Sequence, residues 1–149
     1  MKLSVLHCIP SFTGGGAERQ LSLVAPALAN AGVEVHVAFC GLGPNYARLE
    51  RSDVQLHFIA SNNNHDPALA WKMFQLVRRL KPDIVQTWLL QMDILGGAAA
   101  LLNRVPLIVS ERSSAAAHAP SWKTRLRMQI GRRAACIVAN SGGGVDYWR

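Results

Sequence analysis

The sequence is poor in acidic residues. Only nine of its 149 residues are Asp or Glu, against 16 Lys and Arg, so the formal net charge is +7. This excess favours an anionic partner, which could be a nucleic acid, a phosphorylated metabolite or an acidic membrane surface. The chain also lacks an Asp-x-Asp pair that would hold a divalent ion. We therefore expect neither a metal nor a bound cofactor.

Cysteines and long apolar runs are also scarce. Cys8, Cys40 and Cys136 are odd in number, far apart and embedded in apolar runs. Their spacing is not that of zinc ligands. We predict that they are buried free thiols in a reducing compartment, which indicates a cytoplasmic protein. The longest apolar block, residues 94–102, is too short to span a bilayer. The start, MKLSVLHCIP, lacks the cleavage site of a signal peptide and is interpreted as a first strand.

What the chain does contain is a regular alternation of apolar runs and helical patterns. A hydrophobic content of 50% indicates one globular domain with a substantial core. The runs KLSVLHCI, VEVHVAFC, VQLHFIA, DIVQTW, PLIVS and ACIVA predict about six strands. Most of the segments between them have apolar residues at helical spacing. This pattern predicts an α/β fold with a three-layer, Rossmann-like open parallel sheet and helices on both faces.

Glycine and proline residues suggest where elements end. Gly32 is expected at the end of one helix and Pro82 just past another, whereas Pro26 lies inside a helix and should bend it. Asn140 or Ser141 is expected to cap a last helix that has barely begun at residue 149. We therefore expect residues 1–149 to be a truncated part of a longer protein.

Three consecutive glycines, Gly14, Gly15 and Gly16, follow the first strand and begin the first helix. Glycine lets backbone amides approach a phosphate closely at a helix N-terminus, although a tight turn without a ligand is an alternative interpretation. The loop does not fit the dinucleotide fingerprint, because GGGAER is not G-x-G-x-x-G and strand two ends without an acid. It also lacks the Lys-Ser/Thr pair of a P-loop, and the chain has no G-x-S-x-G elbow.

Three segments together resemble a known family. GGGAERQLSLVAPALANAGVEVHV, KPDIVQTW with LGGAAALLNRVPLIVSERSS, and ACIVANSGGGVDYW are similar to the N-terminal half of family 4 (group 1) glycosyltransferases of the GT-B fold. The resemblance implies a two-domain enzyme in which this half holds the acceptor. An absent C-terminal domain would bind most of the nucleotide diphosphate sugar. Gly15 and Gly16 would then face the donor diphosphate or the acceptor, and transfer would mostly retain the anomeric configuration.

Two segments depart from the pattern of many relatives. QTW replaces a His-x-His pair after strand four, and Arg112 in SERS occupies a histidine position after strand five. An arginine cannot act as a base near neutral pH, but its donor fork could clamp a phosphate or a sugar oxygen. Arg112 is thus the candidate catalytic residue. The alternative is a solvated loop arginine paired with Glu111 or another acid.

Other polar and aromatic residues near the strand ends are weaker candidates. The residues that we predict to bind substrate are Gly14, Gly15, Gly16, Trp88, Gln91, Glu111, Arg112, Asn140 and Ser141. Trp88 and Gln91 could contact a sugar, but packing beneath the loop is the commoner role. Asp93 is interpreted as a first-turn helix acid, and His118 as a loop residue without a specific role. His7, His36 and His57 fall in strands and are expected in or beside the core.

The segment PSWKTRLRMQIGRR, residues 120–133, predicts a basic amphipathic helix. Trp122, Leu126 and Ile130 share one face, and the cations around them are Lys123, Arg125, Arg127, Arg132 and Arg133. Such a helix can lie on an anionic membrane, or it can pack on the sheet with a solvated cationic face. Nothing in the segment is typical of a nucleic-acid-binding module.

The resemblance thus implies the acceptor-side domain of a bacterial hexosyltransferase for cell-envelope polysaccharide biosynthesis. Its partners would be a nucleotide sugar, a saccharide or lipid-linked acceptor and an anionic membrane surface, with no nucleic acid. We expect it in the cytoplasm, peripheral on the inner face of the membrane, and inactive as an isolated fragment. The alternative is a non-catalytic α/β module that binds a phosphorylated ligand.

Overall fold

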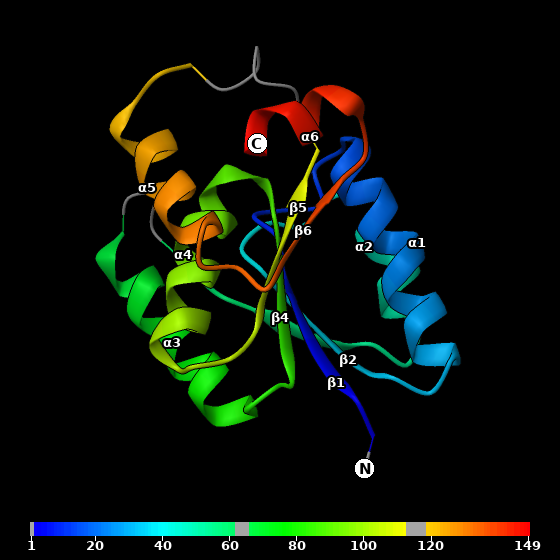
Figure 1. The fold of residues 1–149 in the computed structure, drawn as a ribbon. Coiled ribbons are helices and arrows are strands. Elements are labelled where there is room, and N and C mark those ends of the chain that lie inside the picture. The colour runs from blue at the N-terminus through cyan, green and yellow to red at the C-terminus, as the bar shows by residue number, and fades with distance from the viewer. Residues whose placement is uncertain (1, 62–65, 113–118) are drawn as a thin grey trace.

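The computed structural model describes residues 2–61, 66–112 and 119–149, which form six strands and six helices in alternation (Figure 1). The strands are β1 (Ser4–Cys8), β2 (Glu34–Phe39), β3 (Gln55–Phe58), β4 (Ile84–Trp88), β5 (Leu107–Glu111) and β6 (Cys136–Ala139). The helices are α1 (Gly16–Asn30), α2 (Tyr46–Glu50), α3 (Pro67–Leu80), α4 (Leu89–Leu102), α5 (Trp122–Gly131) and α6 (Gly142–Trp148).

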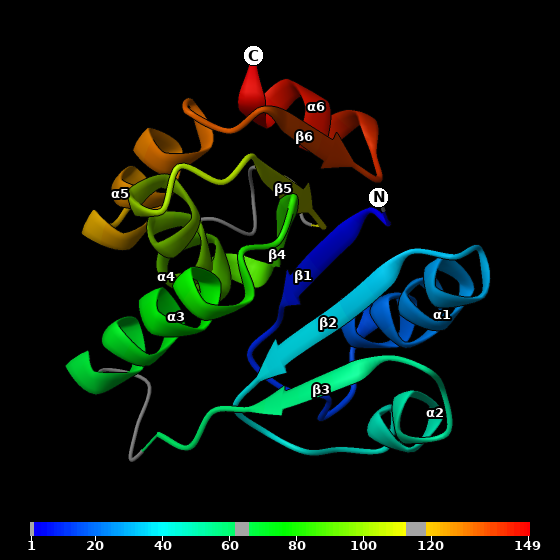
Figure 2. The same ribbon diagram turned by 90° about the horizontal axis from the view of Figure 1, so that it is seen from below.

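The strands form one sheet in the order β3-β2-β1-β4-β5-β6. Every pairing is parallel, and β1 lies between β2 and β4. Helices α1 and α2 cover one face, while α3, α4 and α5 cover the other (Figures 1 and 2). The three-layer, Rossmann-like fold class predicted from the sequence is confirmed.

Two apolar cores lie on opposite faces of the sheet, because alternate residues of each strand point to opposite sides. Leu6 and Cys8 of β1 pack with α3, α4 and α5, in a core that includes Met73 and Met92. The core on the other face joins residues of β2 and β4 to α1 and α2, and it contains Phe12, Leu21, Phe39, Leu49 and Trp88. Burying each of these large side chains contributes about 1.5–3 kcal/mol.

The helix ends agree with the local sequence. Gly32 has φ 91°, and its amide donates to the Ala29 carbonyl at 3.0 Å, which closes α1. The Asp66 side chain caps α3, and this helix ends at Leu80, two residues before Pro82. Pro26 lies inside α1, which continues through it as one helix. The bend at Pro26 remains a prediction.

The cysteines do not share one environment. Cys8 is fully buried, which raises the pKa of its thiol far above the ordinary value, and Cys40 is partly buried. Cys136 is exposed, so the prediction of a buried thiol is wrong there. Cys136 begins β6, which has a strand neighbour only on its β5 side, and an apolar run in such an edge strand is not enclosed as in a central one.

Candidate functional site

The sheet reverses its direction of connection between β1 and β4. Helix α1 follows β1 onto one face, and α4 follows β4 onto the other (Figure 2). In open parallel sheets, ligands bind outside the carboxyl ends of the strands at such a switch point. The chain passes from Trp88 in β4 directly into α4, because Leu89 adopts a left-handed φ of 69°. This conformation costs about 1–2 kcal/mol for a non-glycine residue.

The glycine loop lies on one side of the switch point. Gly14 has φ 126°, which side chains rarely tolerate, and a Cβ on Gly15 would lie 2.5 Å from the Glu18 carboxylate. Gly15 is the N-cap of α1 and supplies no side-chain hydrogen bond, and all three glycines are exposed. Helix α1 therefore begins at exposed glycines without a side-chain cap, an arrangement that can accept an anion.

Trp88 lies beneath this edge of the sheet and contacts a histidine and an arginine. It is only 3% exposed, so the prediction that it packs is confirmed. Its indole N–H donates to Nδ1 of the fully buried His7 at 3.3 Å. The guanidinium carbon of Arg112 lies 5.3 Å from the centre of the indole ring, which is within range of a cation–π contact.

Arg112 immediately follows β5 and is partly buried. Its Nε is enclosed by protein but has no hydrogen-bond partner within the described residues. Burial lowers the pKa of Arg112 from its ordinary value, although the guanidinium stays charged near neutral pH. The salt bridge with Glu111 that the sequence suggested as an alternative is not found among the described residues, because Glu111 pairs elsewhere.

A buried ionic cluster joins α4, β5, α5 and α6. Nε of Arg127 donates to Asp93 at 2.7 Å, and its Nη1 lies 2.8 Å from Glu111. The Thr87 hydroxyl donates to the other Asp93 oxygen at 2.7 Å, and the Trp148 indole N–H donates to Glu111 at 2.9 Å. The side chains of Arg127, Asp93 and Glu111 are at most 2% exposed, so these charges are compensated within the protein.

This cluster corrects two interpretations. Asp93 is not a first-turn helix acid, because α4 begins at Leu89 and the Asp93 carboxylate is buried against Arg127. Burial raises the pKa of Asp93, and the Arg127 charge and the Thr87 hydroxyl oppose that rise. Arg127 is not part of a solvated cationic face, because it points inward. For Glu111, a direct role as a substrate ligand remains a prediction.

Asn140 and Ser141 lie between β6 and α6. The Ser141 hydroxyl accepts from the Gly144 amide at 3.1 Å, so the predicted cap is confirmed. Asn140 is exposed, and its amide donates to the Glu111 carbonyl at 3.3 Å. Both residues thus follow the strand beside β5, and their roles in substrate binding remain predictions.

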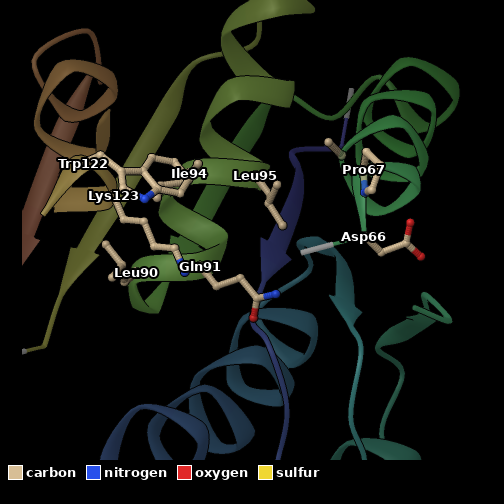
Figure 3. Close-up of a pocket in the computed structure, with 9 residues that line it drawn as sticks. Asp66, Pro67, Leu90, Gln91, Ile94, Leu95, Trp122 and Lys123 are labelled. Atoms are coloured by element: carbon tan, nitrogen blue, oxygen red, sulfur yellow. The ribbon is translucent and has the colours of Figure 1, made fainter. Parts of the chain in front are cut away.

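Gln91 lines a cavity of about 300 Å³ at the N-terminal ends of α3, α4 and α5 (Figure 3). Most of the lining is apolar, with polar groups from Asp66, Gln91 and Lys123. The remaining lining residues are Pro67, Ala70, Leu90, Ile94, Leu95 and Trp122. The sequence indicated Gln91 and Trp122 separately, but it did not show that three helices bring them to one cavity.

Helix α5 is rotated relative to the predicted amphipathic pattern. Ile130 is buried as expected, whereas Trp122 is 68% and Leu126 40% exposed. The inward face contains Thr124, Arg127, Ile130 and Gly131. The outer face of α5 therefore presents two large apolar side chains among cations, while Arg127 stabilises the interior.

The other histidines have separate environments. His7 is fully buried, and burial lowers its pKa to about 4. Nδ1 of His36 lies 3.0 Å from Nε2 of His57, in β2 and β3 away from the switch point. The prediction that His7, His36 and His57 lie in or beside the core is confirmed, whereas His118 lies outside the described residues.

Metal-ligand clusters and membrane-spanning helices were sought among the same residues. Residues 2–61, 66–112 and 119–149 contain no group of three or more His, Cys, Asp or Glu that could hold a metal ion. Within these ranges no helix has the length and hydropathy to cross a bilayer.

The fold and the exposed loop at its switch point define an open, Rossmann-like α/β domain. Residues 14–149 match the model of Glycosyltransferase Family 4, and the chain belongs to this family. No functionally curated protein matches its sequence significantly.

Solved structures of the GT-B class share the fold. HepE from Anabaena, in complex with UDP-glucose, is similar over 98% of this chain with a TM-score of 0.77 and 19% identity. MurG from Acinetobacter baumannii is similar over 93% with a TM-score of 0.65 and 18% identity. UDP-GlcNAc 2-epimerase from Methanocaldococcus jannaschii is similar over 99% with a TM-score of 0.67 and 14% identity. The chain spans 40–42% of the lengths of these structures and has the fold of the N-terminal half of a GT-B protein.

Proposed function

We propose that the protein containing this chain transfers a hexose from a nucleotide diphosphate sugar to a saccharide or lipid-linked acceptor, with retention of configuration. Residues 1–149 form the acceptor-side domain, and a second domain binds most of the donor. The observation that carries this proposal is the exposed, uncapped N-terminus of α1 at the switch point, where Gly14–Gly16 leave the backbone accessible. Membership of the family and the UDP-glucose bound to HepE support it.

Arg112 neutralises developing negative charge on the donor in this proposal. The cation–π contact with Trp88 holds the guanidinium near the carboxyl end of β5. The first-turn amides of α1 supply further donors to the diphosphate. The chain has no Asp-x-Asp pair that could hold a metal ion on the diphosphate, so the proposal assigns charge neutralisation to Arg112 and these amides.

Replacing Arg112 by lysine tests this role. Lysine keeps the charge but loses the planar donor fork, so we expect kcat/KM of the protein containing this chain to fall about tenfold. The rate is measured with a panel of nucleotide diphosphate sugars, and Arg78→Lys, an exposed change in α3, is the matched control. Equal rates for Arg112→Lys and the control would remove Arg112 from the site. Binding of a nucleotide sugar without any transfer would favour the non-catalytic module.

The acceptor is lipid-linked and belongs to bacterial envelope polysaccharide synthesis in this proposal. The 300 Å³ cavity has apolar walls, and Trp122 at its rim continues onto the exposed outer face of α5 with Leu126. Lys123 and Arg125 lie beside them and can attract anionic headgroups. The protein would thereby work at the cytoplasmic surface of the membrane.

Vesicle binding tests the membrane contact. We expect the protein to bind vesicles of equal parts phosphatidylglycerol and phosphatidylcholine, and to lose most binding when salt is raised. Trp122→Ala is expected to weaken binding about three- to tenfold in a sedimentation assay, because it removes the largest exposed apolar side chain of α5. Trp71→Ala, another exposed tryptophan in α3, is the control. Equally weak binding to anionic and neutral vesicles at low salt would contradict the proposal.

A further inference from the structure

An open groove of about 780 Å³ lies between the edge strand β3 and helix α3. Figure 2 shows β3 at the end of the sheet, away from β4, β5 and β6. The groove is lined by Leu56, His57, Phe58, Ile59, Ala60, Trp71, Lys72, Gln75, Leu76 and Arg79. None of these residues lines the cavity near Gln91, so the groove is a separate concave surface.

The groove is cationic. Lys72 and Arg79 are both exposed, and the described lining contains no acidic residue. The Lys72 ammonium donates to the Ala60 carbonyl at 2.6 Å, which fixes it at the wall beside the end of β3. Burial lowers the pKa of His57, and the nearby charges of His36 and Arg79 lower it further. The ring of His57 is therefore neutral near neutral pH and can donate or accept a hydrogen bond.

The same groove exposes one aromatic ring. Trp71 is 60% exposed, although it is a large apolar side chain. Phe58 of β3 is 58% exposed, but its ring packs against Phe39 of the other core, with the ring centres 5.7 Å apart. Trp71 stacks on Phe74 with the ring centres 5.5 Å apart, so its orientation is supported from one side while much of the ring remains accessible. The electron-rich face of an aromatic ring is attracted to C–H groups that have partial positive charge, such as those on one face of a pyranose.

We propose that this groove binds an anionic saccharide chain. Lys72 and Arg79 pair with its carboxylate or phosphate groups, Trp71 packs against a sugar ring, and Gln75 and His57 hydrogen-bond to hydroxyls. A concave groove fits a flexible chain, whereas a flat bilayer favours protruding residues such as Trp122. Two cations and one exposed ring are fewer than the continuous basic track and the successive stacking rings typical of single-stranded nucleic-acid sites. The inference does not need the proposed transferase activity, because it concerns binding alone.

Binding of tetragalacturonate, measured by calorimetry in low salt, tests the proposal. We expect it to bind at least tenfold more tightly than neutral maltotetraose, and to weaken as salt is raised. Lys72→Gln with Arg79→Gln is expected to reduce its affinity at least tenfold, and Trp71→Ala at least threefold. Arg104→Gln with Arg133→Gln, which removes two exposed arginines outside the groove, should leave the affinity unchanged. Amide shifts in the unaltered protein should map to residues 56–60 and 71–79, which does not depend on the folding of any variant.

Several outcomes would overturn the assignment. These are equal affinities for tetragalacturonate and maltotetraose, unchanged binding in the Lys72→Gln, Arg79→Gln variant, or amide shifts confined to the glycine loop. Tighter binding of oligothymidylate or of phosphatidylglycerol vesicles at these residues would assign the groove to that other ligand instead. The assay contains no nucleotide sugar, so its failure is distinct from a failure of sugar transfer.

Discussion

Replacing Arg127 by alanine is expected to lower the free energy of unfolding by about 3–5 kcal/mol, because it leaves two buried carboxylates without their cation. Arg127 contacts Asp93 at 2.7 Å and Glu111 at 2.8 Å, and all three side chains are at most 2% exposed. The guanidinium also lies 5.0 Å from the ring centre of Trp148, so the substitution removes support for α6 as well. Urea unfolding followed by far-UV circular dichroism measures the change.

Two further variants separate charge from packing. Arg125→Ala changes an exposed arginine of the same helix and should alter stability by no more than about 0.5 kcal/mol. Arg127→Met keeps much of the buried volume but still leaves the two buried carboxylates without a cation. Adding Asp93→Asn and Glu111→Gln should recover part of the lost stability, since no buried charge then remains unpaired. A loss for Arg127→Ala no larger than that of Arg125→Ala would show that the cluster does not stabilise the fold.

The sheet could be predicted because its information is local. Each of the six Val- and Ile-rich runs indicates a strand within a few residues. Gly32 marks the end of a helix and Ser141 the start of another in the same local way. Their positions in the chain then limit the topology, since parallel strands need crossover helices. The glycine loop could be predicted for the same reason, because the φ of 126° at Gly14 is one that favours glycine.

The cluster around Arg127 could not be predicted in this way. Arg127 is separated from Asp93 by 34 residues and meets it only when α4 and α5 pack on the sheet. The spacing of Trp122, Leu126 and Ile130 suggested the wrong inward face, because burial of an arginine depends on partners that no periodicity reveals. Glu111 was predicted as a substrate ligand or as a partner of Arg112, but its carboxylate contacts Arg127 and Trp148, which lie far away in the sequence.

Between pH 7 and pH 4, His7 is expected to cost the protein about 3 kcal/mol of stability. Its ring is fully buried, and burial lowers its pKa from 6.5 to about 4. In this range the unfolded chain takes up a proton at His7 that the folded chain does not, so the free energy of unfolding rises with pH and falls as the solution is acidified. The gap of about 2.5 between the two pKa values corresponds to about 3 kcal/mol.

The variant His7→Asn isolates this contribution. Asparagine places an oxygen near the position of Nδ1, where it can accept the Trp88 indole N–H that His7 accepts at 3.3 Å, but it does not titrate. Acidification from pH 7 to pH 4 should therefore lower the unfolding free energy of the unaltered protein by about 3 kcal/mol more than that of His7→Asn. Carboxylates and His57 titrate in both proteins and cancel from this difference. Parallel stability curves would mean that His7 accepts a proton in the folded state as readily as in the unfolded chain, and that the contact with Trp88 is not maintained by a neutral ring.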